Sequence, residues 1–306
     1  MAKVVILGVF VADTAYRASR PPRMGETIMG EHFALGPGGK GSNQAVASAK
    51  AGADTHFITR LGRDTFADMA LKTWEDAGVK PAITQHEDGY TGAAYIFVEA
   101  GTGNNAIIVC PGVAGSISPA DIDARADLIS NAAVFVTQLE QPMDAAMRGL
   151  QIAREGGATT ILNPAPAATL PEGMLALCDY VTPNETEAEA LTGIAVSTLE
   201  DATKAAAELM RMGAKSVVIT LGEKGALYNA GGQSVHVPAF NAGPVAETTG
   251  AGDAFNGGFA AALAAGMDPV DAVRFGCATA SISVTRPGTA PSMPSLAEIK
   301  ELLALP

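Results

Sequence analysis

The segment ETTGAGDAFNGG, residues 247–258, leads into an alanine-rich stretch that is typical of a buried helix. Its small residues Gly250, Ala251 and Gly252 allow backbone N–H groups to turn inward, at the point where the positive end of the helix dipole lies. This geometry predicts an anion hole suited to a phosphoryl group, with Asp253 as a candidate general base in the first helical turn. In the simpler interpretation, Asp253 is only a favourable charge at a helix N-terminus. The segment alone leaves both interpretations open.

Around this segment, short β-rich runs alternate with helical segments along most of the chain. The predicted strands are Lys3–Phe10, Thr55–Leu61, Ala133–Val136, Thr159–Asn163, Tyr180–Thr182 and Ser216–Thr220. The predicted helices are Ser42–Ala51, Phe66–Ala77, Met143–Glu155, Glu185–Leu191 and Leu199–Met212. Such alternation predicts βαβ units and an α/β fold with a mostly parallel sheet and helices on both faces.

Two stretches, Ile28–Leu35 and Tyr90–Val109, read as strand material without an intervening helix. They could form a small antiparallel flap over an active site or an ordinary edge hairpin, and periodicity alone favours neither. No linker is long enough to separate two independent domains, so we expect one domain over residues 1–306.

Composition narrows the functional classes. The chain has 306 residues, a net charge of −12 and 48% hydrophobic residues, so it can build a large core. A strongly acidic chain binds polyanions poorly, which disfavours nucleic acid and anionic membrane surfaces as partners. The three widely spaced cysteines favour reduced thiols in a cytoplasmic protein, and the four histidines show no metal-binding spacing. We expect the apolar run near the N-terminus to be a buried strand, not a signal peptide.

Three further loops are candidates for ligand binding. The glycine-rich stretch 36–44 could bring backbone and Asn43 close to a polyhydroxyl ligand, or it could be a plain turn before a helix. In 182–187, Asn184 and Glu187 have the spacing of a helix capping box, which suffices to explain them. The loop 220–225 follows a predicted strand where α/β proteins bind ligands, although a hairpin turn is the default interpretation.

In this order, the segments resemble the ribokinase/PfkB family of sugar kinases from about Lys3 to Ser292. The resemblance is carried by the ordered occurrence of Gly25-Glu26-Thr27, Gly38–Gly41, Asn43–Val46, Gln138-Leu139-Glu140, Asn163–Ala167, Thr182–Glu189, Gly250–Asp253 and Val284-Thr285-Arg286. It implies a three-layer α/β/α fold with a mostly parallel central sheet. It also implies a small discontinuous β lid, roughly residues 12–36 and 88–110, through which such kinases often form homodimers.

The resemblance further implies transfer of the ATP γ-phosphate to the 5-hydroxyl of D-ribose. Asp253 would be the general base, and the backbone of Gly250, Ala251 and Gly252 would form the anion hole. The implied sugar-binding residues are Asp13, Gly38, Gly39, Lys40, Asn43, Glu140 and Asp253. The implied ATP-binding residues are Asn184, Thr220, Leu221, Gly222, Glu223, Lys224, Gly225, Gly252 and Cys277. Glu187 would help to hold Mg²⁺ through water.

One position departs from the family pattern, because Glu247 stands where Asp is usual. In the family, this position helps to form a monovalent-cation site. The other implied positions of that site are Thr249, Ser283, Arg286, Gly288 and Ser292. The extra methylene of Glu247 could shift the carboxylate or fill part of the site, so K⁺ activation is an expectation that needs its own test.

The stretches Phe10–Asp13 and Val109–Gly112 differ from the typical ribose-specific pattern. A kinase for another pentose, a hexose, a keto-deoxy sugar acid or a nucleoside is therefore an alternative. A non-catalytic sugar-binding homologue is a third hypothesis, although a sensor has no need of a base beside an anion hole.

Overall fold

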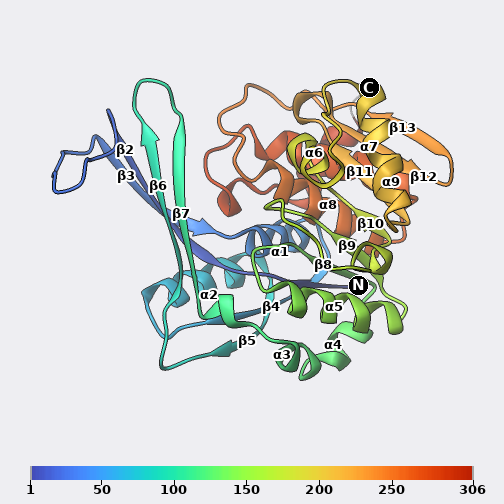
Figure 1. Cartoon of the computed structure of the whole chain (residues 1–306), viewed down its shortest axis with the longest axis horizontal. Coiled ribbons are helices and arrows are strands. Elements are labelled where there is room, and N and C mark those ends of the chain that lie inside the picture. Colours follow the sequence, from blue (N-terminus) through green and yellow to red (C-terminus); the bar gives the residue numbers. More distant parts are fainter. Residues whose placement is uncertain (1, 305–306) are drawn as a thin grey trace.

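The computed structural model describes residues 2–304. Its main sheet has nine strands in the order β13-β12-β11-β10-β9-β8-β1-β4-β5 (Figure 1). The strands are β1 Lys3–Leu7, β4 Asp54–Leu61, β5 Lys80–Gln85, β8 Val134–Thr137, β9 Thr159–Leu162, β10 Tyr180–Val181, β11 Ser216–Thr220, β12 Ala226–Ala230 and β13 Gln233–Val237. The pairs from β11 to β5 are parallel, and β12 and β13 add an antiparallel edge. The predicted mostly parallel sheet is confirmed.

Helices cover both faces of this sheet. One face carries α1 Lys40–Lys50, α2 Thr65–Ala77, α8 Ala251–Ala264, α9 Pro269–Ser283 and α10 Leu296–Ala304. The other carries α3 Pro119–Asp123, α4 Ala126–Ser130, α5 Met143–Glu155, α6 Glu185–Thr192 and α7 Leu199–Arg211. The side chains of β1 alternate between the two cores, since Val4 and Ile6 belong to one and Val5 and Leu7 to the other. This alternation explains the continuous apolar run of β1 and confirms the three-layer architecture.

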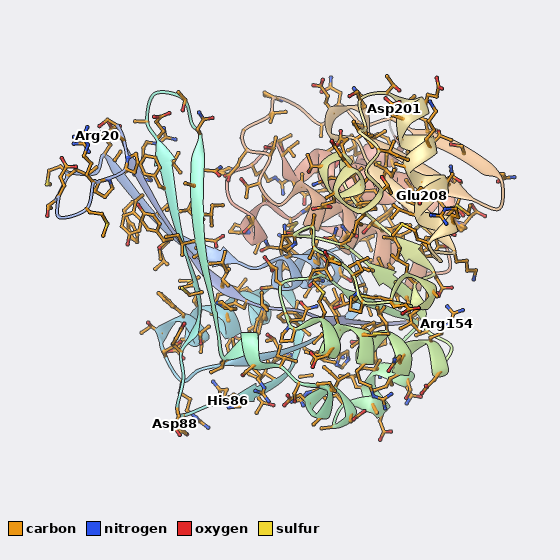
Figure 2. The ribbon with its side chains drawn as sticks, in the orientation of Figure 1. Arg20, His86, Asp88, Arg154, Asp201 and Glu208 are labelled. Carbon is orange, nitrogen blue, oxygen red and sulfur yellow. The ribbon has the colours of Figure 1, made fainter. Side chains whose placement is uncertain are left out.

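A second sheet of four strands, the lid sheet, projects from one side of the body (Figure 1). Its order is β3-β2-β6-β7, with β2 Val11–Ala18, β3 His32–Gly38, β6 Thr91–Glu99 and β7 Asn105–Gly112. The β2–β6 pair is parallel and the other pairs are antiparallel. The small extra sheet is therefore confirmed in place of the edge hairpin. Figure 2 shows Arg20 at the outer end of the lid sheet, far from Asp201 and Glu208 on α7.

Several boundaries differ from the prediction. The first strand ends at Leu7 and not at Phe10, and β2 follows it after a short break. The strand predicted from Ile28 begins at His32. The helix α9 was not predicted, because its many small and buried residues blur the helical period of hydrophobicity. Within residues 2–304, no helix combines the length and apolar character needed to cross a membrane.

Candidate active site

The site lies where the strand order of the main sheet reverses. From β1 the chain moves to β4 on one side and later returns to β8 on the other, which leaves a crevice at the carboxyl ends of β1 and β8. Gly8 follows β1 there and touches the start of α1. A Cβ on Gly8 would lie 2.7 Å from the Cα of Gly41 and 2.4 Å from Oε1 of Gln138. Glycine therefore lets the N-terminal end of α1 enter the crevice.

Close packing of α1 against α8 brings the candidate base to this crevice. A Cβ on Gly257 would lie 2.4 Å from the Cβ of Ala47, so the two helices meet almost backbone to backbone. About one turn nearer the N-terminus of each helix, Asn43 Nδ2 donates to Oδ2 of Asp253 at 3.0 Å. Gln44 Nε2 donates to Oδ1 of Asp253 at 3.1 Å. Both carboxylate oxygens are therefore held by amides from α1.

Burial and charge compete in setting the protonation of Asp253. Burial raises the pKa of Asp253, whereas Lys40 and the amides of Asn43 and Gln44 lower it. Burial lowers the pKa of Lys40, but attraction by Asp253, Glu140 and Glu187 raises it overall. Lys40 is therefore the cation that balances a cluster of carboxylates.

The turn before α8 supplies a partial anion hole. Gly250 caps the helix with a φ of 82°, a left-handed conformation that favours glycine. The N–H of Ala251 donates to the carbonyl of Thr248 at 3.2 Å, so it is already engaged within the turn. The N–H groups of Gly250 and Gly252 have no partner among residues 2–304. A Cβ on Gly252 would meet nothing within 4 Å, so a ligand can approach its N–H.

The predicted sugar-binding residues gather near Asp253. The backbone N–H of Lys40 donates to Oε2 of Glu140 at 2.8 Å. Burial raises the pKa of Glu140 to about 7. Burial, with repulsion from Asp253 and Glu247, raises the pKa of Asp13 to about 6.

Two glycines make room for these groups. A Cβ on Gly38 would lie 2.2 Å from Oδ2 of Asp13, so only glycine accommodates that carboxyl. Gly39 has a φ of 88° and caps α1, and its Cβ would lie 2.5 Å from the carbonyl oxygen of Val9. The two glycines therefore let Asp13 and the start of α1 lie against each other.

A cavity of about 150 Å³ extends from Asp253 to the carboxyl ends of the strands β9, β10 and β11. It is lined by Lys40, Asn163, Ala165, Thr182, Asn184, Glu187, Thr220, Gly250, Gly252, Asp253 and Asn256. Asn163, Thr182 and Asn256 were not predicted as site residues. Their signal was position, since Asn163 and Thr182 are the last residues of two predicted strands, at the end where α/β proteins bind ligands.

The capping box predicted in α6 is present. The N–H of Glu187 donates to Oδ1 of Asn184 at 2.8 Å, and the N–H of Asn184 donates to Oε2 of Glu187 at 2.9 Å. Glu187 also lines the cavity, so one carboxylate oxygen caps the helix while the other remains available to a ligand. Burial raises the pKa of Glu187. The capping and ligand-binding interpretations of this residue are therefore compatible.

The predicted ATP loop forms the turn between β11 and β12, so the hairpin interpretation is correct in structure. Thr220 lines the cavity, and its N–H donates to the carbonyl of Pro183 at 2.9 Å. The other predicted residues of this loop do not line the cavity. Leu221 and Gly225 are buried, and Gly222, Glu223 and Lys224 are exposed on the surface. Cys277 lies on α9 with its side chain in the hydrophobic core, and it does not line the cavity. Burial raises the pKa of its thiol to about 12.

Among the residues implied for a monovalent cation, Glu247 and Thr249 precede α8, and the others lie between Ser283, the last residue of α9, and Ser292. Oε2 of Glu247 accepts the N–H of Gly288 at 2.8 Å, so the longer carboxylate holds the segment after α9 directly. The guanidinium of Arg286 pairs with Glu298. The hydroxyls of Ser283 and Ser292 donate to nearby backbone carbonyls. Thr249 is exposed.

Comparisons with known proteins agree with this geometry. The model of the pfkB family carbohydrate kinases matches residues 1–296. The chain belongs to the pfkB family of carbohydrate kinases. The ribokinase of Staphylococcus aureus (strain COL) is 40% identical over 304 residues, covering 98% of this chain and 99% of the relative. The deoxyribokinase of Salmonella typhi is 36% identical over 304 residues, covering 99% of each.

A solved structure shows the same likeness in three dimensions. The structure of Arabidopsis thaliana ribokinase complexed with ribose and ATP matches this pfkB-family chain with a TM-score of 0.95 at 31% identity. The match covers 100% of this chain and 99% of that one. The family resemblance inferred from the ordered motifs is therefore confirmed.

Proposed function

We propose that this pfkB-family kinase transfers the γ-phosphate of ATP to the 5-hydroxyl of D-ribose. The observation that carries the proposal is a buried carboxylate, Asp253, that faces Lys40 and lies beside two N–H groups at the N-terminus of α8 with no partner among residues 2–304. A carboxylate alone could be structural. A base and an anion hole in one cavity supply the proton acceptor and the charge stabilisation that phosphoryl transfer requires.

In this mechanism, Asp253 accepts the proton of the sugar hydroxyl as the hydroxyl oxygen bonds to the γ-phosphorus. The bond between that phosphorus and the β–γ bridging oxygen breaks at the same time, and ADP leaves. The N–H groups of Gly250 and Gly252 face the charge that develops on the phosphoryl oxygens. Lys40 keeps Asp253 anionic before the transfer. Asp13, Asn43 and Glu140 would orient the sugar, because carboxylates and amides pair directionally with hydroxyls.

The divalent-metal role assigned to Glu187 fits the residues present. Within residues 2–304, no group of three or more His, Cys, Asp or Glu could enclose a metal ion. This agrees with Mg²⁺, which keeps several waters and binds substrate phosphates with few protein ligands. When bound, Mg²⁺ neutralises phosphate charge. Glu187 and Asn184 would hold its waters, and Thr220 would contact the nucleotide.

Three further proposals concern the K⁺ site, the contact of Cys277 with ATP and the cytoplasmic location. In the proposed K⁺ site, Glu247 accepts the N–H of Gly288 and so joins the segment before α8 to the segment after α9. Cys277 would contact ATP only from the body of α9, which makes it the least supported of the proposed nucleotide residues. The proposed cytoplasmic location rests on the use of free cysteines.

We also propose that the kinase forms a homodimer through the lid sheet. Tyr16, Phe33, Tyr95 and Ile108 expose between 38% and 62% of their surface on this sheet. The ring of Tyr16 lies 5.1 Å from that of Phe33 and 5.5 Å from that of Tyr95, so the aromatic side chains form one patch. An exposed apolar patch of this kind is typical of a protein–protein contact.

A coupled assay of ADP release over a panel of sugars and nucleosides tests the proposed acceptor. We expect ribose to give the highest kcat/KM. The 36% identity to a deoxyribokinase favours 2-deoxyribose as the second candidate, because it presents the same 5-hydroxyl. No turnover of ribose would refute the first assignment, and no turnover of any acceptor would refute the kinase assignment.

A further inference from the structure

The side chain of Gln44 contacts the candidate base but is absent from the predicted site. Gln44 is fully buried on α1, and its Nε2 donates to Oδ1 of Asp253 at 3.1 Å. We propose that Gln44 is a positioning residue that holds Asp253 in one orientation and favours its anionic form. The inference rests on the proposed phosphoryl transfer and extends it to a residue that does not itself contact the sugar.

Hydrogen-bond logic gives the Gln44 amide a single orientation. Asn163 Nδ2 donates to the carbonyl of Thr182 at 3.0 Å, and a backbone carbonyl can only accept. Asn163 must therefore turn its Oδ1 toward Gln44, whose Nε2 donates to it at 3.1 Å. The carboxylate of Asp253 also accepts only. Both neighbours thus require the NH₂ group of Gln44 on the same side, and the reversed amide would face two acceptors with an oxygen.

The other end of the amide is also occupied. Gln138 Nε2 donates to Oε1 of Gln44 at 2.6 Å. Gln138 is itself fully buried, and its Oε1 points at Gly8 and Gly41 in the crevice. The network therefore runs from the carboxyl end of β8 through α1 to the first turn of α8. Oε1 of Gln138 has no hydrogen-bond partner among residues 2–304, whereas the nitrogen and the oxygen of Gln44 both have partners, which fix its amide in one arrangement.

Asn43 and Gln44 are neighbours with different roles. Asn43 donates to Oδ2 of Asp253, and its own Oδ1 is buried without a partner among residues 2–304. That oxygen is available to a sugar hydroxyl. The oxygen and nitrogen of Gln44 are both used within the protein. Gln44 therefore has no polar atom aimed at a ligand, and it acts through Asp253.

The charges around Asp253 explain why the hydrogen bond from Gln44 matters for its protonation. Lys40 is the cation that faces the base, and the nearby carboxylates are Asp13, Glu140 and Glu187. Burial raises the pKa of Asp253, and Lys40, Asn43 and Gln44 oppose that rise. Removing the Gln44 donor should therefore favour the protonated carboxyl, which cannot accept a proton from the substrate.

The test compares Gln44→Met and Gln44→Glu with the wild-type enzyme, on whichever acceptor the wild type uses best. We expect Gln44→Met to lower kcat about ten- to hundredfold, as for a lost hydrogen bond to a charged group, with the acceptor KM within about threefold. The acid limb of the pH profile of kcat should move to higher pH. Gln44→Glu keeps the size of the side chain and adds a carboxylate beside Asp253. The acid limb of its kcat profile should therefore move to higher pH than that of Gln44→Met.

Gln141→Met is the matched control. Gln141 is also a buried glutamine, and its Nε2 donates to the hydroxyl of Thr137 and the carbonyl of Gln138, not to Asp253. Both Met variants should lose thermal stability, but only the Gln44 variant should move the acid limb. An unchanged limb in Gln44→Met, or an equal shift in Gln141→Met, would overturn the proposal.

A second measurement does not depend on turnover. The titration of the Asp253 carboxyl in the free protein can be followed by ¹³C NMR, with Asp253→Asn to assign the signal. Its midpoint should rise in Gln44→Glu, which keeps the native shape, and an unchanged midpoint would refute the proposal. A protein that phosphorylates no acceptor but shows this rise would contradict the proposed function alone.

Discussion

The strands β1 and β7 contain similar apolar runs, but the run in β1 is buried and the run in β7 is exposed. In β1, Val4 to Leu7 are fully buried, because helices cover both faces of the main sheet. In β7, Ile107, Ile108 and Val109 expose 54%, 62% and 49% of their surface. These residues point alternately to the two faces of the lid sheet, and within residues 2–304 no helix covers either face there (Figure 1). An apolar run therefore predicts a strand, but the layers around it decide whether the strand forms core or contact surface.

The two regions also differ in what they contribute to the site. The body supplies Asp253, Lys40 and the N–H groups of Gly250 and Gly252 from the N-terminal ends of α1 and α8, two helices that pack closely against each other. The lid sheet supplies Asp13 at its base and an apolar surface further out. We therefore expect substitutions in the body to change the chemical step, and substitutions on the outer lid to change association.

The largest effect is expected at the base. Asp253→Asn keeps the shape of the side chain but replaces one of its two accepting oxygens with a donor. The amide cannot act as a base, so kcat should fall by about three orders of magnitude or more. Sugar binding, measured by calorimetry, should change little. Asp201→Asn is the matched control, because Asp201 occupies the same third helical position in α7 on the surface (Figure 2). Near-normal turnover in Asp253→Asn would remove it as the base and leave it a helix-terminal charge.

The second prediction concerns the lid surface. Ile108→Asp places a charge in the exposed apolar patch, so the proposed dimer should dissociate at concentrations where the wild type remains associated. Sedimentation velocity measures the change, and kcat of the dissociated protein should stay within about twofold if the chemistry belongs to the body. Leu199→Asp, at an exposed position on α7, is the control. A monomeric wild type, or equal effects of both variants, would refute the lid interface.

The third prediction concerns stability and pH. The pKa of Glu140 is raised by burial from 4.5 to about 7, so the folded state binds more protons than the unfolded chain between these values. The contribution of Glu140 to the free energy of unfolding therefore falls as pH rises through that range and stays low above it. At pH 8, Glu140→Gln should raise the free energy of unfolding by about 1–3 kcal/mol, while sugar affinity falls.

Urea unfolding at pH 5 and pH 8 measures this effect, which should be much smaller at pH 5. Glu189→Gln is the control, because Glu189 is exposed on α6. A variant that is less stable than the wild type at pH 8 would show that the carboxylate stabilises the body, contrary to the prediction.

The smallest effect is expected at the proposed cation site. Because Glu247 holds the N–H of Gly288, we expect K⁺ to raise kcat only a few-fold over Na⁺ at equal ionic strength, and Glu247→Asp to increase that ratio. Initial rates over a K⁺ titration measure both values. Equal turnover in K⁺ and Na⁺ for both proteins would exclude monovalent-cation activation.

Much of the site was predictable because its parts are local motifs. The turn before α8, the capping box of Asn184 and Glu187, and the hairpin loop after β11 each lie within a few residues, so their spacing is visible in the chain. The strand β2 was not predicted from its own residues, because polar and apolar residues do not alternate regularly along it. The lid segment of roughly residues 12–36, which the resemblance implies, includes most of it. Gln44 was missed because its importance comes from its neighbours and not from its own motif.

The sequence by itself determined the layered α/β fold and the family, because apolar periodicity and the order of short motifs can be read directly from the chain. It also predicted Asp253 as the base. Tertiary structure decided which groups meet. Asn43 and Gln44 reach Asp253 across 210 and 209 residues only because α1 and α8 pack closely at Gly257. It also decided that β1 is core and β7 is surface. Burial depends on what packs against a segment, and that partner lies elsewhere in the chain or on another copy of it.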